Sequence, residues 1–471
     1  MKAVTTFKKN VVSVLAVLIL IAFPAAAQSF GFGDAGAAEK EAATESDAST
    51  PSAATGATVG GSINFYGTGF LSDFSDPANA TVWNGSTGTL NFSAKGSKAE
   101  AAFKLKISGD ILTSDPAKLI DEAYIRMFIG PLELEGGLLK VSWGKADSQS
   151  VLDVLNPFDL TDLTVTDTRE RKIAQPMLHL SAAIGSASKA EIAFLPGFQA
   201  SSVAWEGKWM PALVGTYKST LGITDIDTAT SVISFPTTNT LSYAQGGARF
   251  TTTVGSVDLG AQYFYGLLPT MAVSPAAVAA YLTAAGYHAA APLVYPAPNA
   301  IPVYYNRYHQ AGLDVATELF GFNLRAEAAA NITADTSGDD PNTYNPTAAW
   351  TLGFDRDLLA GINLNLQGSG TIRLMNDKVT SALDLEKTSD AVKTKITAVL
   401  SQKLFKDTLE WQVAGIYGIE KNDFFVYPSV GYIVGDARLD LTVGIFGGDR
   451  SGDLGQFTDS NYVSLSLTYS F

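Results

Sequence analysis

The chain has 471 residues, a formal net charge of −14 and no cysteine, and 17% of its residues are charged. The lack of cysteine excludes disulfide scaffolds, thiolate zinc sites, Fe–S clusters and cysteine nucleophiles. The low charged fraction, together with 25 Phe and 18 Tyr, argues against a disordered chain, and the balance of 32 basic against 46 acidic residues disfavours nucleic acid as a partner.

Residues 1–27 have the three parts of a secretory signal peptide. Lys2, Lys8 and Lys9 form a cationic start, residues 11–22 are almost entirely apolar, and three alanines precede a predicted cleavage before Gln28. The apolar run is shorter than the roughly 20 residues that a spanning helix needs. We therefore expect export across the inner membrane.

Residues 28–60 are rich in alanine, serine, threonine, glycine and acidic residues and show no apolar periodicity. Such a composition cannot bury enough apolar surface to offset the ordering entropy. We predict a low-complexity acidic periplasmic tail over 28–60, followed by one domain over 61–471.

From about Ser62 onward, apolar and polar residues alternate with a period of two, which is typical of β-strands. The last segment shows this best, with Val463, Leu465, Leu467, Tyr469 and Phe471 on one face and serine or threonine at the positions between them. One face of each strand is apolar and the other can carry charge.

The links between these strands alternate in length. Tight turns such as 130–131 and 435–436 alternate with long links such as 146–174, 197–240 and 267–300, although the link at 421–422 is short. This layout predicts an all-β protein: a transmembrane antiparallel β-barrel of about 18 strands, or 16, with short periplasmic turns and long extracellular loops. The barrel must close because lipid cannot pair a free strand edge. We expect it in the outer membrane of a diderm bacterium, in contact with outer-membrane lipid.

Aromatic residues near strand ends favour interfacial girdles. The candidates are Tyr66, Trp143, Tyr265, Trp350, Trp411, Tyr417 and Tyr469.

The end of the chain resembles the assembly signal of bacterial outer-membrane proteins. The residues that carry this resemblance are Leu465, Leu467, Tyr469 and the terminal Phe471. The resemblance implies that the barrel-assembly machinery is a partner.

A second resemblance rests on residues 132–145, which end in Val-Ser-Trp-Gly-Lys, on 154–160 and on the last hairpin with 446–449 and 459–464. These segments are similar to an outer-membrane barrel family of unknown function that is distantly like alginate-export porins. The family has Gly-Arg-Gln and Trp-Gly-Glu where this chain has Gly137-Leu138-Leu139 and Trp143-Gly144-Lys145.

Charged residues on the polar faces are the candidates for lining the lumen: Lys104, Lys106, Arg126, Arg325, Glu327, Arg373, Arg438 and Asp440. Two interpretations stay open. Clustered basic side chains would select solutes by charge and modestly favour anions. Alternatively, opposite charges pair across strands and only solvate the wall.

Two long links are candidate constrictions, and both could equally decorate the surface. The first carries Asn156, Pro157, Phe158 and Asp159. The second predicts a short helix, with Ser274 as N-cap and Pro275 in the first turn.

Nothing in the sequence favours an enzyme. The three histidines, His179, His288 and His309, are scattered, and His179 shares a face with Ser181 as any two strand residues two apart do. We expect no catalytic residues, metal or cofactor. The sequence predicts a channel that passes small solutes through a polar lumen. The alternatives are a fatty-acid-type transporter of hydrophobic compounds and a surface structural or adhesion barrel with a closed lumen.

Overall fold

The computed structural model describes residues 56–75, 82–113, 116–223, 229, 232–284 and 301–471. The predicted signal peptide, the predicted tail up to residue 55 and His288 lie outside the described residues.

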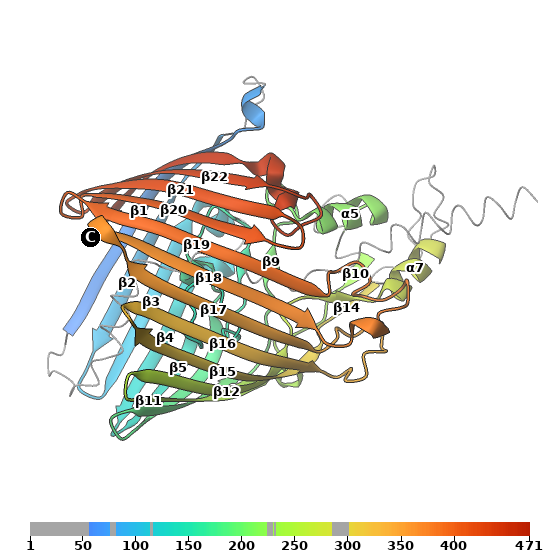
Figure 1. Ribbon diagram of the computed structural model, residues 1–471, viewed down its shortest axis with the longest axis horizontal. Coiled ribbons are helices and arrows are strands. Elements are labelled where there is room, and N and C mark those ends of the chain that lie inside the picture. The colour runs from blue at the N-terminus through green and yellow to red at the C-terminus, as the bar shows by residue number, and fades with distance from the viewer. Residues whose placement is uncertain (1–55, 76–81, 114–115, 224–228, 230–231, 285–300) are drawn as a thin grey trace, which may run out of the picture.

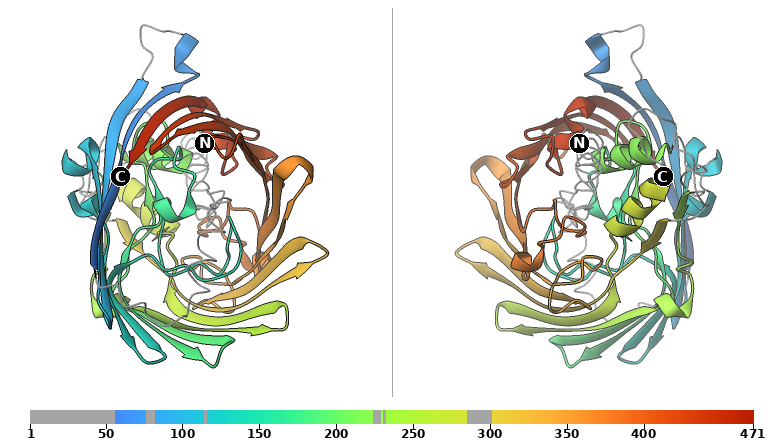
Figure 2. Two further views of the ribbon diagram at one scale, coloured as in Figure 1. Left: turned by 90° about the vertical axis from the view of Figure 1, so that its left-hand side faces the viewer. Right: turned by 90° about the vertical axis from the view of Figure 1, so that its right-hand side faces the viewer.

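Eighteen antiparallel strands close into one barrel, which confirms the predicted fold class (Figures 1 and 2). The first strand pairs with both the second and the last, and the seam runs from Ser62 opposite Ser470 to Phe70 opposite Tyr462. In order around the barrel, the strands are β1 (Gly56–Phe70), β2 (Val82–Lys95), β3 (Ala99–Ser108), β4 (Ile120–Ile129), β5 (Leu132–Leu139), β7 (Gln175–Ile184), β8 (Ser188–Leu195), β11 (Gln245–Val254), β12 (Val257–Leu267), β15 (Arg307–Leu319), β16 (Phe322–Thr333), β17 (Thr347–Asp357), β18 (Ile362–Arg373), β19 (Val392–Leu404), β20 (Leu409–Gly418), β21 (Asp423–Val434), β22 (Ala437–Gly447) and β23 (Tyr462–Ser470).

The alternation in sequence becomes an inside and an outside. In β4, Ile125, Met127 and Ile129 are exposed on the outer face, and Arg126 between them points inward to Glu135. The same exposed apolar positions recur around the ring. A closed antiparallel barrel with an apolar exterior and a polar interior is the form in which strands span the bacterial outer membrane, and the protein belongs there.

Apart from the four-residue link 419–422, which joins β20 to β21 at the opposite end, the short links lie at one end of the barrel. They cover residues 96–98, 130–131, 185–187, 255–256, 320–321, 358–361, 405–408 and 435–436. In the two-residue turn at 320–321, Phe320 and Gly321 have φ of 54° and 75°, as a turn that matches the strand twist requires. The barrel begins and ends at this same end. Since β1 begins at Gly56, residues 56–60 of the predicted tail stretch are part of the first strand.

The long loops at the other end carry the remaining elements, except for the 3₁₀ turn Leu359–Gly361, which lies in the short link 358–361 (Figure 1). The helices are α3 (Gly109–Thr113), α4 (Thr168–Arg171), α5 (Ala212–Leu221) and α7 (Pro275–Ala284), and the short strands are β6 (Asp159–Leu160), β9 (Ser202–Val203), β10 (Ile233–Ser234), β13 (Ala272–Val273) and β14 (Ile301–Tyr304). The 3₁₀ turns are η2 (Asp73–Ser75), η3 (Pro116–Leu119), η4 (Leu241–Tyr243), η5 (Leu359–Gly361), η6 (Asn376–Lys378) and η7 (Gly455–Ser460). Within the described residues, the helices all lack the length and apolar character needed to cross a membrane.

Helices α5 and α7 and strands β10, β13 and β14 form what we call the cap. It has an apolar core of its own, which includes Leu221, Ile233, Val278, Leu282 and Ile301. The helix predicted after Ser274 is therefore present as α7, and the Ser274 hydroxyl accepts the N–H of Ala277 at 3.3 Å. This link packs into the cap.

The aromatic prediction is wrong at two positions. Trp143 is buried inside the barrel, and Tyr66 lies on the inward face of β1 opposite Ser466. Tyr265, Tyr417 and Tyr469 are exposed on the outer face, as interfacial residues should be. Trp143 deviates because it follows the end of β5, where the chain leaves the wall.

Candidate functional site

Residues 140–174, which follow β5, turn into the lumen, and we call this segment the inner loop (Figure 2). Asn156 holds its two ends together. The Nδ2 of Asn156 donates to the carbonyls of Leu139 at 2.8 Å and Ile173 at 3.0 Å, and its Oδ1 accepts the N–H of Val141 at 2.8 Å. Because one buried amide satisfies three backbone groups, the loop leaves and rejoins the wall at neighbouring points.

Glu327 on β16 anchors the first part of the inner loop from the far side of the lumen. Its side chain is 3% exposed. Oε1 accepts the N–H groups of Lys145 at 2.5 Å and Ala146 at 2.7 Å, and Oε2 accepts the Ser150 hydroxyl at 2.8 Å and the Val151 N–H at 2.9 Å. Hydrogen bonds to an ionised group are the strong ones, so four on one carboxylate hold this part of the loop firmly.

The close approach to Glu327 requires a glycine. Gly144 has a φ of 102°, and a Cβ at this position would lie 2.4 Å from Oε1 of Glu327. Only glycine combines this backbone conformation with that contact. The Trp-Gly-Lys segment therefore shapes the turn that meets the carboxylate.

The next residues of the inner loop are tied to three neighbouring strands. The Asp147 carboxylate accepts hydrogen bonds from Arg325 at 2.8 Å and Asn365 at 2.7 Å. The Thr351 hydroxyl donates to the carbonyl of Gln149 at 2.7 Å. Strands β16, β17 and β18 thus hold the tip of the loop.

Apolar side chains pack the inner loop against opposite walls. Trp143, 2% exposed, lies in a cluster with Phe264 of β12 and Tyr308 of β15. Leu163 belongs to a second cluster with Phe425 of β21 and Phe446 of β22. The inner loop therefore crosses the lumen.

The last part of the inner loop returns along β3. Asp167 caps α4, because its side chain accepts the N–H groups of Arg169 and Glu170. Glu170 contacts Lys104 at 3.0 Å and Lys106 at 3.9 Å. Burial alone would raise the pKa of Glu170, but the two ammonium groups outweigh it and hold the pKa below the ordinary 4.5.

The other predicted lumen residues also contact opposite charges. Arg126 lies 2.8 Å from Glu133 and 2.6 Å from Glu135, Arg373 lies 3.0 Å from Glu386, and Arg438 lies 2.5 Å from Glu410 and 2.8 Å from Asp440. All eight predicted residues face the lumen, and each of the six basic ones has a carboxylate partner. The structure brings Arg325, Glu327 and the inner loop together, whereas Arg438 and Asp440 lie apart near a short turn.

The motif 156–159 joins the inner loop to its surroundings. Pro157 accepts the N–H of Ile173 at 2.8 Å. Phe158 is buried, and Asp159 pairs with Lys118 at 2.8 Å. These four residues therefore hold the inner loop where it leaves and rejoins the wall. The part of the loop that contacts the opposite wall is formed by other residues.

Sequence reasoning missed several buried ionic groups, and two of them lie on the strands of the barrel wall. His179 lies between two carboxylates, with Nδ1 at 2.8 Å from Glu135 and Nε2 at 3.2 Å from Glu191. Arg249 on β11 lies 2.7 Å from Asp314 on β15. Alternation could have placed each residue inside, but it does not give the register between strands, which decides which charges meet.

Histidines and carboxylates do not gather into a metal site in the part of the chain that the structure describes. His309 lies on the outer face, where its Nδ1 is 2.6 Å from the Tyr263 hydroxyl.

Comparison with known proteins finds similarity in fold. No protein-family model matches this chain, and no curated protein does. Solved structures with similarity include Pseudomonas aeruginosa OccK3 (OpdO), with 9% identity, a TM-score of 0.48 and coverage of 88% of this chain and 95% of that one. The outer membrane channel DcaP of Acinetobacter baumannii has 11% identity and a TM-score of 0.41, covering 90% and 99%. Wzi of Escherichia coli, described as a carbohydrate-binding β-barrel involved in group 1 capsule assembly, has 12% identity and a TM-score of 0.46, covering 87% and 84%. Similarities this distant assign neither a solute nor an activity to the chain.

Proposed function

We propose that the protein is an outer-membrane channel for small polar solutes, with the inner loop as its constriction. The observation that carries this proposal is the four-bond anchor at Glu327, which holds a loop across an otherwise polar and charged lumen. A loop fixed inside a barrel narrows the aqueous path and sets the size of what passes. Diffusion along such a path needs no cofactor.

The pairing of lumen charges bears on selectivity. An anion preference would need basic side chains whose charge is not compensated nearby, yet Lys104, Arg126 and Arg325 each contact two carboxylates. We therefore propose weak charge selectivity, so the reversal potential in asymmetric salt should lie near zero. A strongly anion-selective reversal potential would favour the basic-lumen interpretation instead.

Single-channel recording in planar bilayers tests the channel. Wild-type protein should give discrete steps, and Glu327→Ala should give larger, noisier steps because the inner loop loses its anchor. Glu318 on β15 is the matched control, since it is exposed near a short turn, and Glu318→Ala should conduct like wild type. If protein shown to be folded by heat-modifiable gel mobility does not conduct, the channel proposal is wrong.

A second candidate, a closed barrel that displays its loops, has one observation in its favour. Leu163 of the inner loop packs on the wall opposite to the one that holds Trp143. A loop held on both sides can seal a lumen. Such a barrel would stay silent in the wild type and conduct only in Glu327→Ala.

A further inference from the structure

The two shortest strands of the barrel, β5 and β8, lie on either side of β7, and we call this part of the wall the low sector. Strands β5 and β8 have 8 residues each, whereas β15 and β19 have 13. Eight tilted strand residues span about 20 Å, which is less than the apolar band of about 25 Å on outer-membrane barrels. At this sector, lipid chains must therefore meet the ends of the strands.

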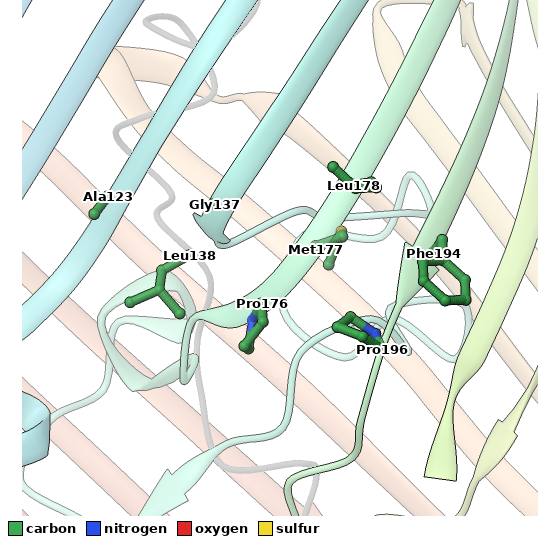
Figure 3. Close-up of a pocket in the computed structure, with 8 residues that line it drawn as sticks. All are labelled: Ala123, Gly137, Leu138, Pro176, Met177, Leu178, Phe194 and Pro196. Atoms are coloured by element: carbon green, nitrogen blue, oxygen red, sulfur yellow. The ribbon is translucent and has the colours of Figure 1, made fainter. Parts of the chain in front are cut away.

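A groove of about 420 Å³ lies on the outer face of this low sector (Figure 3). The residues that line it are glycine and apolar residues, among them Leu138, Pro176, Leu178, Phe194 and Pro196. Leu178 is 54% exposed and Phe194 43%, so the groove opens to the outside of the barrel. Its volume falls within the range of small-molecule binding pockets.

Small residues hollow the groove between the larger ones. Ala123 of β4 lies opposite Leu138 in the strand pairing, and Gly136 lies opposite Leu178. At Gly137 a Cβ would lie 2.1 Å from the carbonyl oxygen of Ala123, so β4 and β5 approach closely where the groove forms. Larger side chains at these positions would fill it.

The groove is closed toward the lumen. Met177 contributes to its lining and also belongs to the buried inner cluster with Leu139 and Leu195. Trp143 of the inner loop lies in the same cluster. An occupant therefore enters from the membrane side.

We propose that this groove binds one acyl chain of an outer-leaflet lipid. It is continuous with the lipid-facing surface of the barrel, and it lies at the long-loop end, where β5 ends and β7 begins. Atoms that line an unfilled apolar groove lack dispersion contacts on the open side. A flexible hydrocarbon chain that fits the groove would supply these contacts. The proposal rests on the membrane location and is independent of channel activity.

Photo-crosslinking in lipid vesicles tests the proposal. The full chain is reconstituted in phosphatidylethanolamine vesicles in which a fraction of the lipid carries a diazirine on one acyl chain. After illumination, labelling of the peptide that contains Leu178 should exceed labelling of the peptide around Leu313, which is equally lipid-facing on a taller strand. Equal labelling of the two peptides overturns the proposal.

Ala123→Trp should fill the groove and reduce labelling at Leu178 severalfold, with labelling at Leu313 unchanged. Ala311→Trp is the control, because Ala311 is an outward alanine on β15 away from the groove. If Ala123→Trp fails to fold, Pro196→Trp, just beyond β8, serves instead. In a second experiment the diazirine is carried by a photoreactive amino acid at position 178, and crosslinks from it to another copy of the chain would assign the groove to a protein contact and refute the lipid.

Discussion

Charged side chains inside this barrel differ in how far they are removed from water. The Arg249–Asp314 pair has side chains 4% and 0% exposed, and it forms because Gly260 leaves room for the Asp314 carboxylate. The Arg450–Asp459 pair in the loop before β23 is largely exposed. A buried charge that loses its partner is strongly destabilising, whereas an exposed pair contributes little.

Asp314→Ala should therefore lower the free energy of unfolding by about 3–5 kcal/mol, because it leaves Arg249 buried without its carboxylate. Asp459→Ala removes the same type of side chain at the exposed pair and should cost less than about 1 kcal/mol. Denaturant unfolding followed by tryptophan fluorescence measures both values. Equal shifts in the two variants would contradict the burial argument.

Glu170 makes the docking of α4 depend on pH. Because the folded-state pKa of Glu170 is below 4.5, its contribution is fully present above pH 4.5 and is lost as the pH falls through the folded value. The chain has no cysteine, so a fluorophore on Thr166→Cys reports on this segment alone. We expect its signal to change below pH 4.5.

Glu170→Gln is the control for this titration, because it removes the charge that Lys104 and Lys106 hold. The labelled Glu170→Gln protein should show the low-pH signal already at pH 7. A pH-dependent change that persists in this variant would assign the transition to another group.

At the scale of elements, the sequence predicts strands far better than it predicts loop paths. Strands and turns follow from local alternation and from short polar links, which need only neighbouring residues. The inner loop depends on contacts such as Glu327 with Lys145, which are 182 positions apart. Nothing in the local pattern of residues 140–174 says whether they turn inward or outward. The prediction that Trp143 lies in an interfacial girdle is wrong for this reason, because Trp143 is buried inside the barrel.

The last strand closes the barrel, and Phe471 takes part directly. Its N–H donates to the carbonyl of Gly61 at 3.0 Å, and its carbonyl accepts the N–H of Gly61 at 2.9 Å. Phe471→Ala should reduce the yield of heat-modifiable barrel in membranes, through loss of the aromatic end of the proposed assembly signal. Phe405→Ala, at an exposed turn position, should leave the yield unchanged. Equal yields from the two variants would argue against a special role for the terminal residue.

At the scale of the whole molecule, three bodies with separate packing share one chain. The barrel is held by a continuous ring of strand pairs, the inner loop by contacts with the inner wall, and the cap by its own apolar core. Separate cores open separately when few contacts join them. The cap should therefore be less stable than the ring beneath it.

Hydrogen exchange measured by mass spectrometry checks this expectation. Amides of α5 and α7 should exchange before those of β16 to β19, because the barrel has no free edge at which to fray. Val278→Ala should speed exchange in the cap and leave the barrel unchanged, whereas Ala329→Gly, inside β16, should do the reverse. Exchange of the cap and the barrel in a single step would show one cooperative unit.

Both ends of the barrel lie at the short-turn end, so the chain is suited to circular permutation. Gly61 and Phe471 are hydrogen-bonded neighbours, and β1 begins five residues before Gly61, so a linker from Phe471 to Gly56 would preserve every strand pair. Any of the eight short turns could then serve as a new start and finish. The order of strands around the ring would not change under such circular permutation, and neither would the side of the membrane on which the chain begins.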